Sequence, residues 1–249
     1  MSWCDKLASR PTVGFTFEKN FRPSAELLSS MIPVLDKLAG RVVDKFTLTK
    51  QETFAIEFIT DSGFRYTADP ARVAVEFQHR LKVRNISGAL PEAQLISRQE
   101  PYTTLLQDVG QRAIEAAELL VSPERPLKRM GVVSSTMVDE PDVPPGILRG
   151  IAYLNRPWGR DVPHYTFQVV ASLQETDEWR DQCVHVISKA ETDEGLINLM
   201  FDYQRIFKTP KDRSSIRAAL IGLQETALKY FEDLAQGDMF DAPDDISAS

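Results

Sequence analysis

Alternating apolar and polar residues predict a series of half-buried β-strands in the first part of the chain. The longest alternation covers residues 72–84, where one set of alternate positions is mainly apolar and the other is basic or polar. A period of two over this length is typical of a strand with one face in the core and one in water. Shorter runs predict further strands at 12–17, 42–49, 52–60 and 64–67. Asp61-Ser62-Gly63 predicts a hairpin turn between the last two of these.

Apolar residues at helical spacing predict three longer helices, over residues 23–39, 103–121 and 212–235. The last is the best defined, because Thr209-Pro210-Lys211-Asp212 combines a cap residue, a first-turn proline and an acid near the helix N-terminus. Other elements are predicted between residues 127 and 207: a strand at 127–138, a helix at 144–155, and strands at 164–174, 181–190 and 196–207.

This order of elements predicts an α+β fold with a mostly antiparallel sheet backed by helices. The order also occurs twice, as a β-α-β4-α half in residues 1–124 and a β-α-β3-α half in residues 125–236. A duplication with a pseudo-two-fold axis is one explanation. Coincidence is the other, because the halves share no visible residue-level repeat. Residues 237–249 hold four aspartates and little to bury, which predicts a disordered acidic tail.

The amino-acid composition disfavours some classes of function. The 249 residues are 43% hydrophobic and 26% charged, which is typical of a globular protein. Lys and Arg number 29 against 36 Asp and Glu, so the net charge of −7 disfavours a general nucleic-acid binder or a basic membrane-surface protein. No apolar run is long enough for a membrane span and no secretory signal is visible, so a cytoplasmic protein without membrane contact is expected. Cys4 and Cys183 are interpreted as incidental thiols in a reducing compartment.

Motifs for nucleotide, cofactor or metal binding are absent from the sequence. There is no phosphate-loop pattern, no dinucleotide-binding glycine triplet, and no histidine or cysteine pair at metal-ligand spacing. No cofactor, metal or catalytic residue is therefore predicted. One alternative comes from Arg180 and His185, which match the Arg-x4-His signature of a class of helical ribonucleases. Residues five apart on a strand point to opposite faces, so the predicted strand at 181–190 argues against this function.

The polar side of the predicted sheet supplies the candidate binding residues. If both halves form one curved sheet, this side becomes a polar concavity able to hold a peptide, a nucleotide or a nucleic acid. Arg72, Arg80, Lys82 and Arg84 are the candidates for phosphate contacts, because alternate strand residues lie about 6–7 Å apart, similar to the spacing of phosphates. Trp158, in a Pro-Trp-Gly-Arg loop, is a candidate anchor for a protein partner.

Across most of its length the chain resembles a sporadically distributed prokaryotic family of about this size. The resemblance rests on an opening strand Pro11–Phe17, a helix Tyr102–Val121 before a strand Leu127–Val132, and a strand Met200–Tyr203 before the terminal helix. This chain departs from the family pattern at Val133-Ser134, where an arginine and a tyrosine are usual. The family implies no established activity, and its patchy distribution implies a role in prokaryotic conflict, such as phage defence or toxin control. In topology alone, the repeated element order resembles the TATA-binding-protein repeat.

Two functions are consistent with these observations. The first is a non-catalytic interaction or regulatory protein, an accessory subunit that binds a protein partner through the sheet face or a sheet edge. The second is a nucleotide or nucleic-acid binding protein that uses the basic residues of the sheet face. Composition disfavours the second, and no catalytic constellation supports an enzyme.

Overall fold

The computed structural model describes the greater part of the chain, and the statements below concern that part. The described residues are 4, 11–19, 29, 33, 36, 37, 46–52, 55–79, 81–84, 92–95, 100–158, 162–189 and 195–236. All but four residues of the predicted helix at 23–39 lie outside them, as does the whole predicted acidic tail at 237–249.

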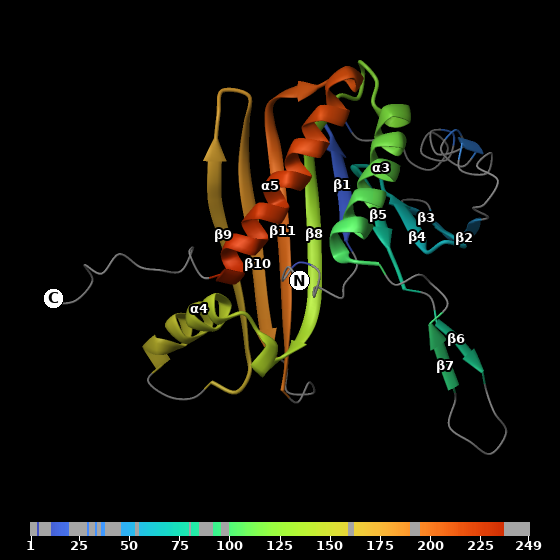
Figure 1. Ribbon diagram of the computed structural model, residues 1–249. Helices are drawn as coiled ribbons and strands as arrows, with labels where there is room; N and C mark the ends of the chain where they lie inside the picture. The colour runs from blue at the N-terminus through green and yellow to red at the C-terminus, as the bar shows by residue number, and fades with distance from the viewer. Residues whose placement is uncertain are drawn as a thin grey trace.

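A nine-stranded sheet, antiparallel throughout, forms the centre of the protein (Figure 1). Its strand order is β2-β3-β4-β5-β1-β8-β11-β10-β9. The strands are β1 (Thr12–Phe17), β2 (Phe46–Glu52), β3 (Ala55–Thr60), β4 (Phe64–Ala68), β5 (Arg72–Phe77), β8 (Leu127–Asp139), β9 (Tyr165–Glu175), β10 (Trp179–Lys189) and β11 (Leu196–Lys211). The α+β fold with a mostly antiparallel sheet is therefore confirmed. Residues 42–45 and 53–54 of the strands predicted at 42–49 and 52–60 lie outside the described residues, and Glu52 belongs to β2.

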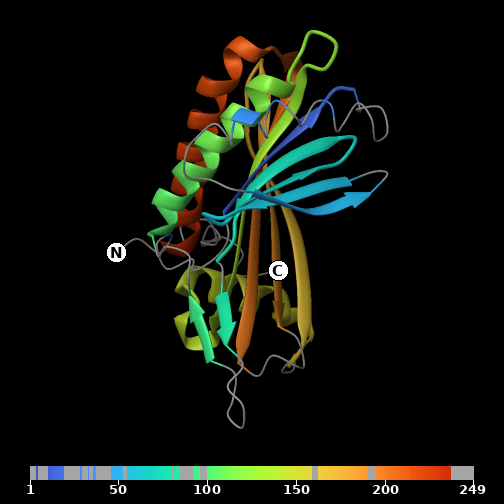
Figure 2. The same ribbon diagram turned by 90° about the vertical axis from the view of Figure 1, so that its right-hand side faces the viewer.

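Three helices cover one face of this sheet (Figure 2). α3 (Tyr102–Leu120) and α5 (Ile216–Gln236) pack against each other, and α4 (Pro145–Asn155) packs against α5. These helices confirm the predictions at 103–121, 144–155 and 212–235. The predicted cap at Thr209 and first-turn proline at Pro210 are wrong, because both residues belong to β11 and Asp212 is the capping residue. Single turns of 3-10 helix occur at Glu140–Asp142, at Arg156–Trp158 and at Arg213–Ser215, where the Asp212 carboxylate accepts hydrogen bonds from two backbone amides.

The core lies between the sheet and the helices. Alternate strand residues turn large side chains toward the helices, as the period of two requires. Phe15, Phe77 and Phe201 are among the side chains with at most 1% exposure, and Leu106 of α3 and Leu220 of α5 are fully buried on the helical side. Burial of each such side chain stabilises the fold by about 1.5–3 kcal/mol. This packing fixes which face of every strand points away from the helices.

The two halves of the sheet have matching topology. In each half the first strand pairs with the last, β1 with β5 and β8 with β11, and the remaining strands follow outward in reverse chain order. The closing helix of each half contacts that same strand pair, α3 over β1 and β5 and α5 over β8 and β11. β1 and β8 pair antiparallel and join the halves into one sheet. This arrangement is what a pseudo-two-fold repeat requires, while its origin by duplication and the boundaries at 124 and 236 stay predictions.

The predicted single strand over residues 72–84 is wrong. β5 ends at Phe77, and Leu81–Arg84 form β6, which pairs with β7 (Glu92–Leu95) in a separate two-stranded sheet (Figure 1). The physical reason is that both neighbours of β5 stop at this point. Phe77 is opposite Phe64, the first residue of β4, and Glu76 is opposite Thr12, the first residue of β1. Beyond them the sheet has no strand for the alternation to pair with.

Candidate functional site

The sheet face that points away from the helices is the candidate binding surface, named here the open face. Over β8 to β11 it presents side chains that are mostly uncharged, a mixture of Val, Met, Ser, Thr, Gln and Asn. Its members are Arg129, Gly131, Val133, Ser135, Met137, Thr166, Gln168, Val170, Ser172, Gln182, Val184, Val186, Ser188, Asn198, Met200, Asp202 and Gln204. Arg180, Lys208, Asp139 and Glu175 also occupy outward positions of these strands. In the three cross-strand rows that begin at Val133, Ser135 and Met137, Asp202 is the one charged residue.

Small residues open a hollow in the middle of this face. Gly14 of β1 is flanked across the strands by Ala74 of β5 and Gly131 of β8, so three adjacent strands present no side chain beyond a methyl group. The resulting hollow has a volume of about 150 Å³. It lies where the two halves of the sheet meet, and Phe15 and Val73 also contribute to its walls.

Arg129 lies at one side of the hollow within a polar network. Its guanidinium donates one hydrogen bond to Gln204 Oε1 at 3.2 Å and another to Thr16 Oγ1 at 3.2 Å. Gln182 Nε2 donates to the same Gln204 oxygen at 3.1 Å. These bonds come from β1, β8, β10 and β11, so the orientation of the guanidinium is set by several strands. A preorganised cation of this kind can bind an anionic group or a carbonyl without further ordering.

Asp202 adds a desolvated carboxylate to the same hollow. Burial raises the pKa of this carboxyl, although a hydrogen bond from Gln204 and the positive charge of Arg129 act in the opposite direction. The hollow therefore holds a hydrogen-bond acceptor and a cation on neighbouring strands. Such a pair suits a ligand or peptide group with both donor and acceptor atoms.

Arg72 is the one predicted binding residue that the structure brings to this hollow. It lies opposite Thr16 on β5, while Arg129 lies opposite Thr16 on β8, so the two arginines flank that threonine from either side. Two strand spacings put their backbones about 10 Å apart. The Arg72 side chain is 72% exposed, and its Nε donates to Asp69 Oδ2 at 2.6 Å.

The other predicted binding residues lie elsewhere. Lys82 and Arg84 belong to β6, in the separate two-stranded sheet, and therefore do not extend the open face from Arg72. Arg80 lies outside the described residues. Trp158 ends the short 3-10 helix that follows α4 and contacts it. The row of four basic residues expected from the alternation is thus not assembled on one face of the main sheet.

Sequence analysis did not identify Arg129 as a binding residue. The available signal was the alternation in the strand 127–138, which places Arg129 on the same side as Gly131. Asp202 and Gln204 lie on the polar side of their own strand by the same rule. Their proximity to Arg129 depends on the pairing of β8 with β11, which a single sequence does not reveal.

Arg180 and His185 are not brought together. Both lie on β10, where Arg180 is exposed and His185 is buried on the helical side. His185 Nε2 is 2.9 Å from the Tyr230 hydroxyl, and burial lowers the pKa of His185 to about 4. Burial likewise raises the pKa of the neighbouring Cys183 thiol far above its ordinary range. This geometry gives no support to a ribonuclease site, which needs both side chains on one surface.

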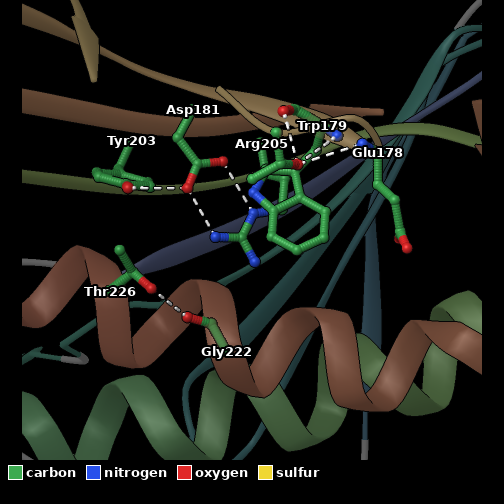
Figure 3. Close-up of polar contacts among 8 residues, drawn as sticks. Glu178, Trp179, Asp181, Tyr203, Arg205, Gly222 and Thr226 are labelled. Carbon is green, nitrogen blue, oxygen red and sulfur yellow. Dashed lines mark hydrogen bonds and ion pairs between the residues drawn. The ribbon is translucent and has the colours of Figure 1, made fainter. Parts of the chain in front are cut away.

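A buried ion pair lies between the sheet and α5 (Figure 3). Arg205 Nε donates to Asp181 Oδ1 at 2.8 Å, and its Nη2 donates to Oδ2 at 2.6 Å. The Tyr203 hydroxyl donates to the same Oδ2 at 3.0 Å, and the Arg205 guanidinium lies 4.7 Å from the centre of the Trp179 ring. Both carboxylate oxygens are therefore engaged. The cluster joins β10 to β11 beneath Gly222 of α5, and we interpret it as structural.

Across the described ranges, no group of three or more His, Cys, Asp or Glu side chains is arranged to hold a metal ion. None of the helices in the same part of the chain is long and apolar enough to cross a membrane. Comparison with protein-family models, with curated proteins and with solved structures gave no match to this chain.

Proposed function

We propose that this chain is a non-catalytic interaction protein that binds a partner polypeptide over the β8–β11 part of the open face. The observation that carries the proposal is the scarcity of charge in the three cross-strand rows that begin at Val133, Ser135 and Met137, where Asp202 is the one charged residue. The centres of protein–protein interfaces are depleted in charged residues and enriched in methionine. The side chains of Val170 and Met137 are 55% and 54% exposed to solvent. Exposed apolar side chains that lie together on one face are typical of a surface that binds another protein.

Charge also separates this proposal from polyanion binding. A surface that binds nucleic acid must neutralise several phosphates with Lys and Arg. The β8–β11 part of the open face carries three cations, Arg129, Arg180 and Lys208, and three anions, Asp139, Glu175 and Asp202. Strand pairing puts Arg180 opposite Glu175, and the Lys208 ammonium lies 2.9 Å from the Glu175 carboxylate, so the charges largely cancel at a distance. The resemblance to a sporadically distributed prokaryotic family supplies a context for the partner, namely an accessory role in phage defence or toxin control.

The experiment compares two matched apolar-to-acidic substitutions. Val186 lies in the middle of the open face between Gln168 and Met200, while Ile221 of α5 is 45% exposed on the helical side. Tagged protein is purified from its native host, the partner is identified by mass spectrometry, and its affinity is then measured with purified components. Val186→Glu is expected to weaken binding at least about tenfold, because a carboxylate would be buried unpaired in the interface. Ile221→Glu is expected to leave the affinity unchanged.

Equal effects of both substitutions, or no effect of Val186→Glu, would contradict binding through the open face. Either result would direct attention to another surface of the chain.

A second candidate function is binding of a nucleotide or a short nucleic-acid segment in the central hollow. It is favoured by Arg72 and Arg129, which flank Thr16 and together present two guanidinium groups above a floor of Gly14 and Gly131. A phosphate between the arginines would gain charge-assisted hydrogen bonds. A planar base could lie on the glycine floor, where no side chain obstructs it.

Titration of nucleoside triphosphates and short oligonucleotides at low salt tests this candidate. Arg129→Gln is expected to weaken binding about tenfold, because it removes one of the two cations. Gly14→Ala is expected to weaken binding while leaving thermal stability nearly unchanged, since the added methyl group meets its nearest atom at 3.7 Å, an ordinary contact distance. Absence of binding at low salt, or binding that is insensitive to both substitutions, refutes the candidate.

A further inference from the structure

β9 is an edge strand whose outer side is exposed. It ends the sheet order next to β10, so one set of its backbone amide and carbonyl groups faces outward. Seven of its eleven residues are exposed, including Val169 at 43% and Val170 at 55%. Exposure of these two adjacent residues means that both faces of the strand are uncovered at its middle. An edge of this kind is a template for pairing with another strand.

The opposite edge of the sheet is protected in ways that β9 is not. β2 contains Lys50 and Glu52 and has an irregular register between Leu48 and Lys50. Charged residues and bulges are the usual devices that prevent an edge from pairing. β9 contains no lysine, arginine or proline, its single charge is the terminal Glu175, and its pairing with β10 is regular from Tyr165 to Ser172. The sequence of β9 therefore leaves this edge of the sheet free of the usual features that prevent pairing with another strand.

We propose that two copies of this chain associate by pairing their β9 strands antiparallel, with the two-fold axis beside Val169. A two-fold axis normal to the sheet makes the two strands antiparallel and leaves the helices of both copies on the same side. Alternate residues point to opposite faces, so two residues can lie opposite each other only if both are odd-numbered or both are even-numbered. With the axis at Val169, every residue from Thr166 to Ser172 is paired with a residue of the second copy, which covers seven of the eight residues in the regular segment Tyr165–Ser172.

The side chains brought opposite each other in this register are complementary. On the helical side Val169 faces its own copy and Phe167 faces Ala171, which gives an apolar row. On the open side Thr166 faces Ser172 and Gln168 faces Val170, so no charge is buried. Cross-strand pairs of these types each contribute roughly 0.2–1 kcal/mol. A second copy therefore supplies a compatible side chain opposite every residue from Thr166 to Ser172.

The association joins the two nine-stranded sheets into one. Because the axis is normal to the sheet, the helices of both copies lie on one side and the two open faces form one continuous surface on the other. The dimer does not depend on the function proposed above: it uses backbone groups at the sheet edge, not the side chains of the open face. Its test is therefore independent of partner binding.

The first measurement is the mass of the purified protein in solution at about 10–100 µM, a range suited to an interface at the small end of specific ones. The wild-type chain is expected at about 56 kDa, twice the 28.1 kDa of one chain. Val169→Lys places two ammonium groups opposite each other and is expected to give a folded monomer of about 28 kDa. Val169→Thr keeps a β-branched side chain of similar size and is expected to remain dimeric. Circular dichroism checks that Val169→Lys is folded.

Disulfide cross-linking tests the pairing without destabilising it. Thr166→Cys and Ser172→Cys variants, mixed and oxidised, are expected to form a cross-linked dimer, whereas neither variant alone is expected to do so. The natural Cys4 and Cys183 are fully buried and do not interfere. A wild-type mass of about 28 kDa over the whole concentration range overturns the proposal. So does an unchanged dimer in Val169→Lys, or the absence of a cross-link in the mixture.

Discussion

At the scale of single residues, burial decides which titratable groups change their charge on folding. His185 lies beneath α5 with Tyr230 as its hydrogen-bond partner, and its ring also packs edge-on against Phe201. Since the imidazolium cannot be hydrated there, its pKa falls from the ordinary 6.5 to about 4. The side chain is thus neutral in the folded protein over the whole neutral range. We therefore expect His185 to act as a core residue whose burial lowers the stability of the folded protein at low pH.

The His185 prediction concerns stability against pH. Between pH 6.5 and pH 4 the unfolded chain binds a proton at this position and the folded chain does not. The contribution of His185 to the free energy of unfolding is therefore complete above pH 6.5 and is lost as the pH falls toward 4. The difference in pKa corresponds to about 3 kcal/mol. Urea unfolding at pH 7 and pH 4 should show a smaller loss of stability in His185→Gln than in the wild-type chain. Equal losses in the two proteins would contradict this account.

At the scale of elements, the ion pair Asp181–Arg205 links two neighbouring strands beneath a helix. β10 and β11 pair along almost their entire length, and the bidentate contact lies near one end of that pairing. Gly222 of α5 lies above the guanidinium, where an added methyl group would come within 3.8 Å of it. A buried ion pair of this kind is costly to break and is not necessarily stabilising as a whole.

Removal of one member of the pair gives a sharp prediction. Arg205→Met leaves the Asp181 carboxylate buried with only the Tyr203 hydroxyl as a donor among its present partners, and is expected to lower the free energy of unfolding by about 3–5 kcal/mol. The double variant Asp181→Leu with Arg205→Met removes the uncompensated charge and is expected to recover most of that loss. Denaturant titration of the wild-type chain, the single variant and the double variant measures these differences in the free energy of unfolding. A double variant as unstable as the single one would show that the cost comes from lost packing.

Most elements in the described part of the chain were predictable, because periodicity is a local property. The helix at 103–121, the turn at Asp61-Ser62-Gly63 and the strand at 127–138 all follow from spacing, and Gly63 has the positive φ of 95° that this turn needs. The error at 72–84 arose because alternation continues after Phe77, where the neighbouring strands have ended. The hairpin of β6 and β7 was missed for a different reason: strands of four residues are too short to give a recognisable alternation.

The candidate site was predictable only in part. Alternation identified the polar sheet face as the candidate binding surface, and Arg72 borders the hollow in that face. The hollow itself depends on Ala74, Gly14 and Gly131 lying side by side, and these residues are far apart in the sequence. Register between distant strands is set by packing over the whole sheet, which no local pattern encodes.

At the scale of the whole molecule, a broad sheet with helices on one face leaves the other face without helical cover. Outward positions of the described strands β3 to β5 and β8 to β11 hold equal numbers of basic and acidic residues. They are Arg65, Arg72, Arg129, Arg180 and Lys208, and Glu57, Glu76, Asp139, Glu175 and Asp202. Arg65 is paired with both Glu57 and Glu76. The face is therefore close to neutral although the chain has a net charge of −7. This distribution is why we expect the salt dependence of partner binding to be weak.

The central position of β1 has a consequence for synthesis on the ribosome. β1 is made first and obtains β5 as its neighbour within the first half, but its second neighbour, β8, is translated more than one hundred residues later. Until then a nascent chain that has completed β5 can hold five paired strands with one side of β1 unpaired. Emergence of Leu127–Asp139 closes that side. A stalled ribosome or a truncated message ending before Leu127 would therefore release a fragment in which one edge of β1 is unpaired. Such a fragment is prone to aggregate and must be removed by quality-control proteases.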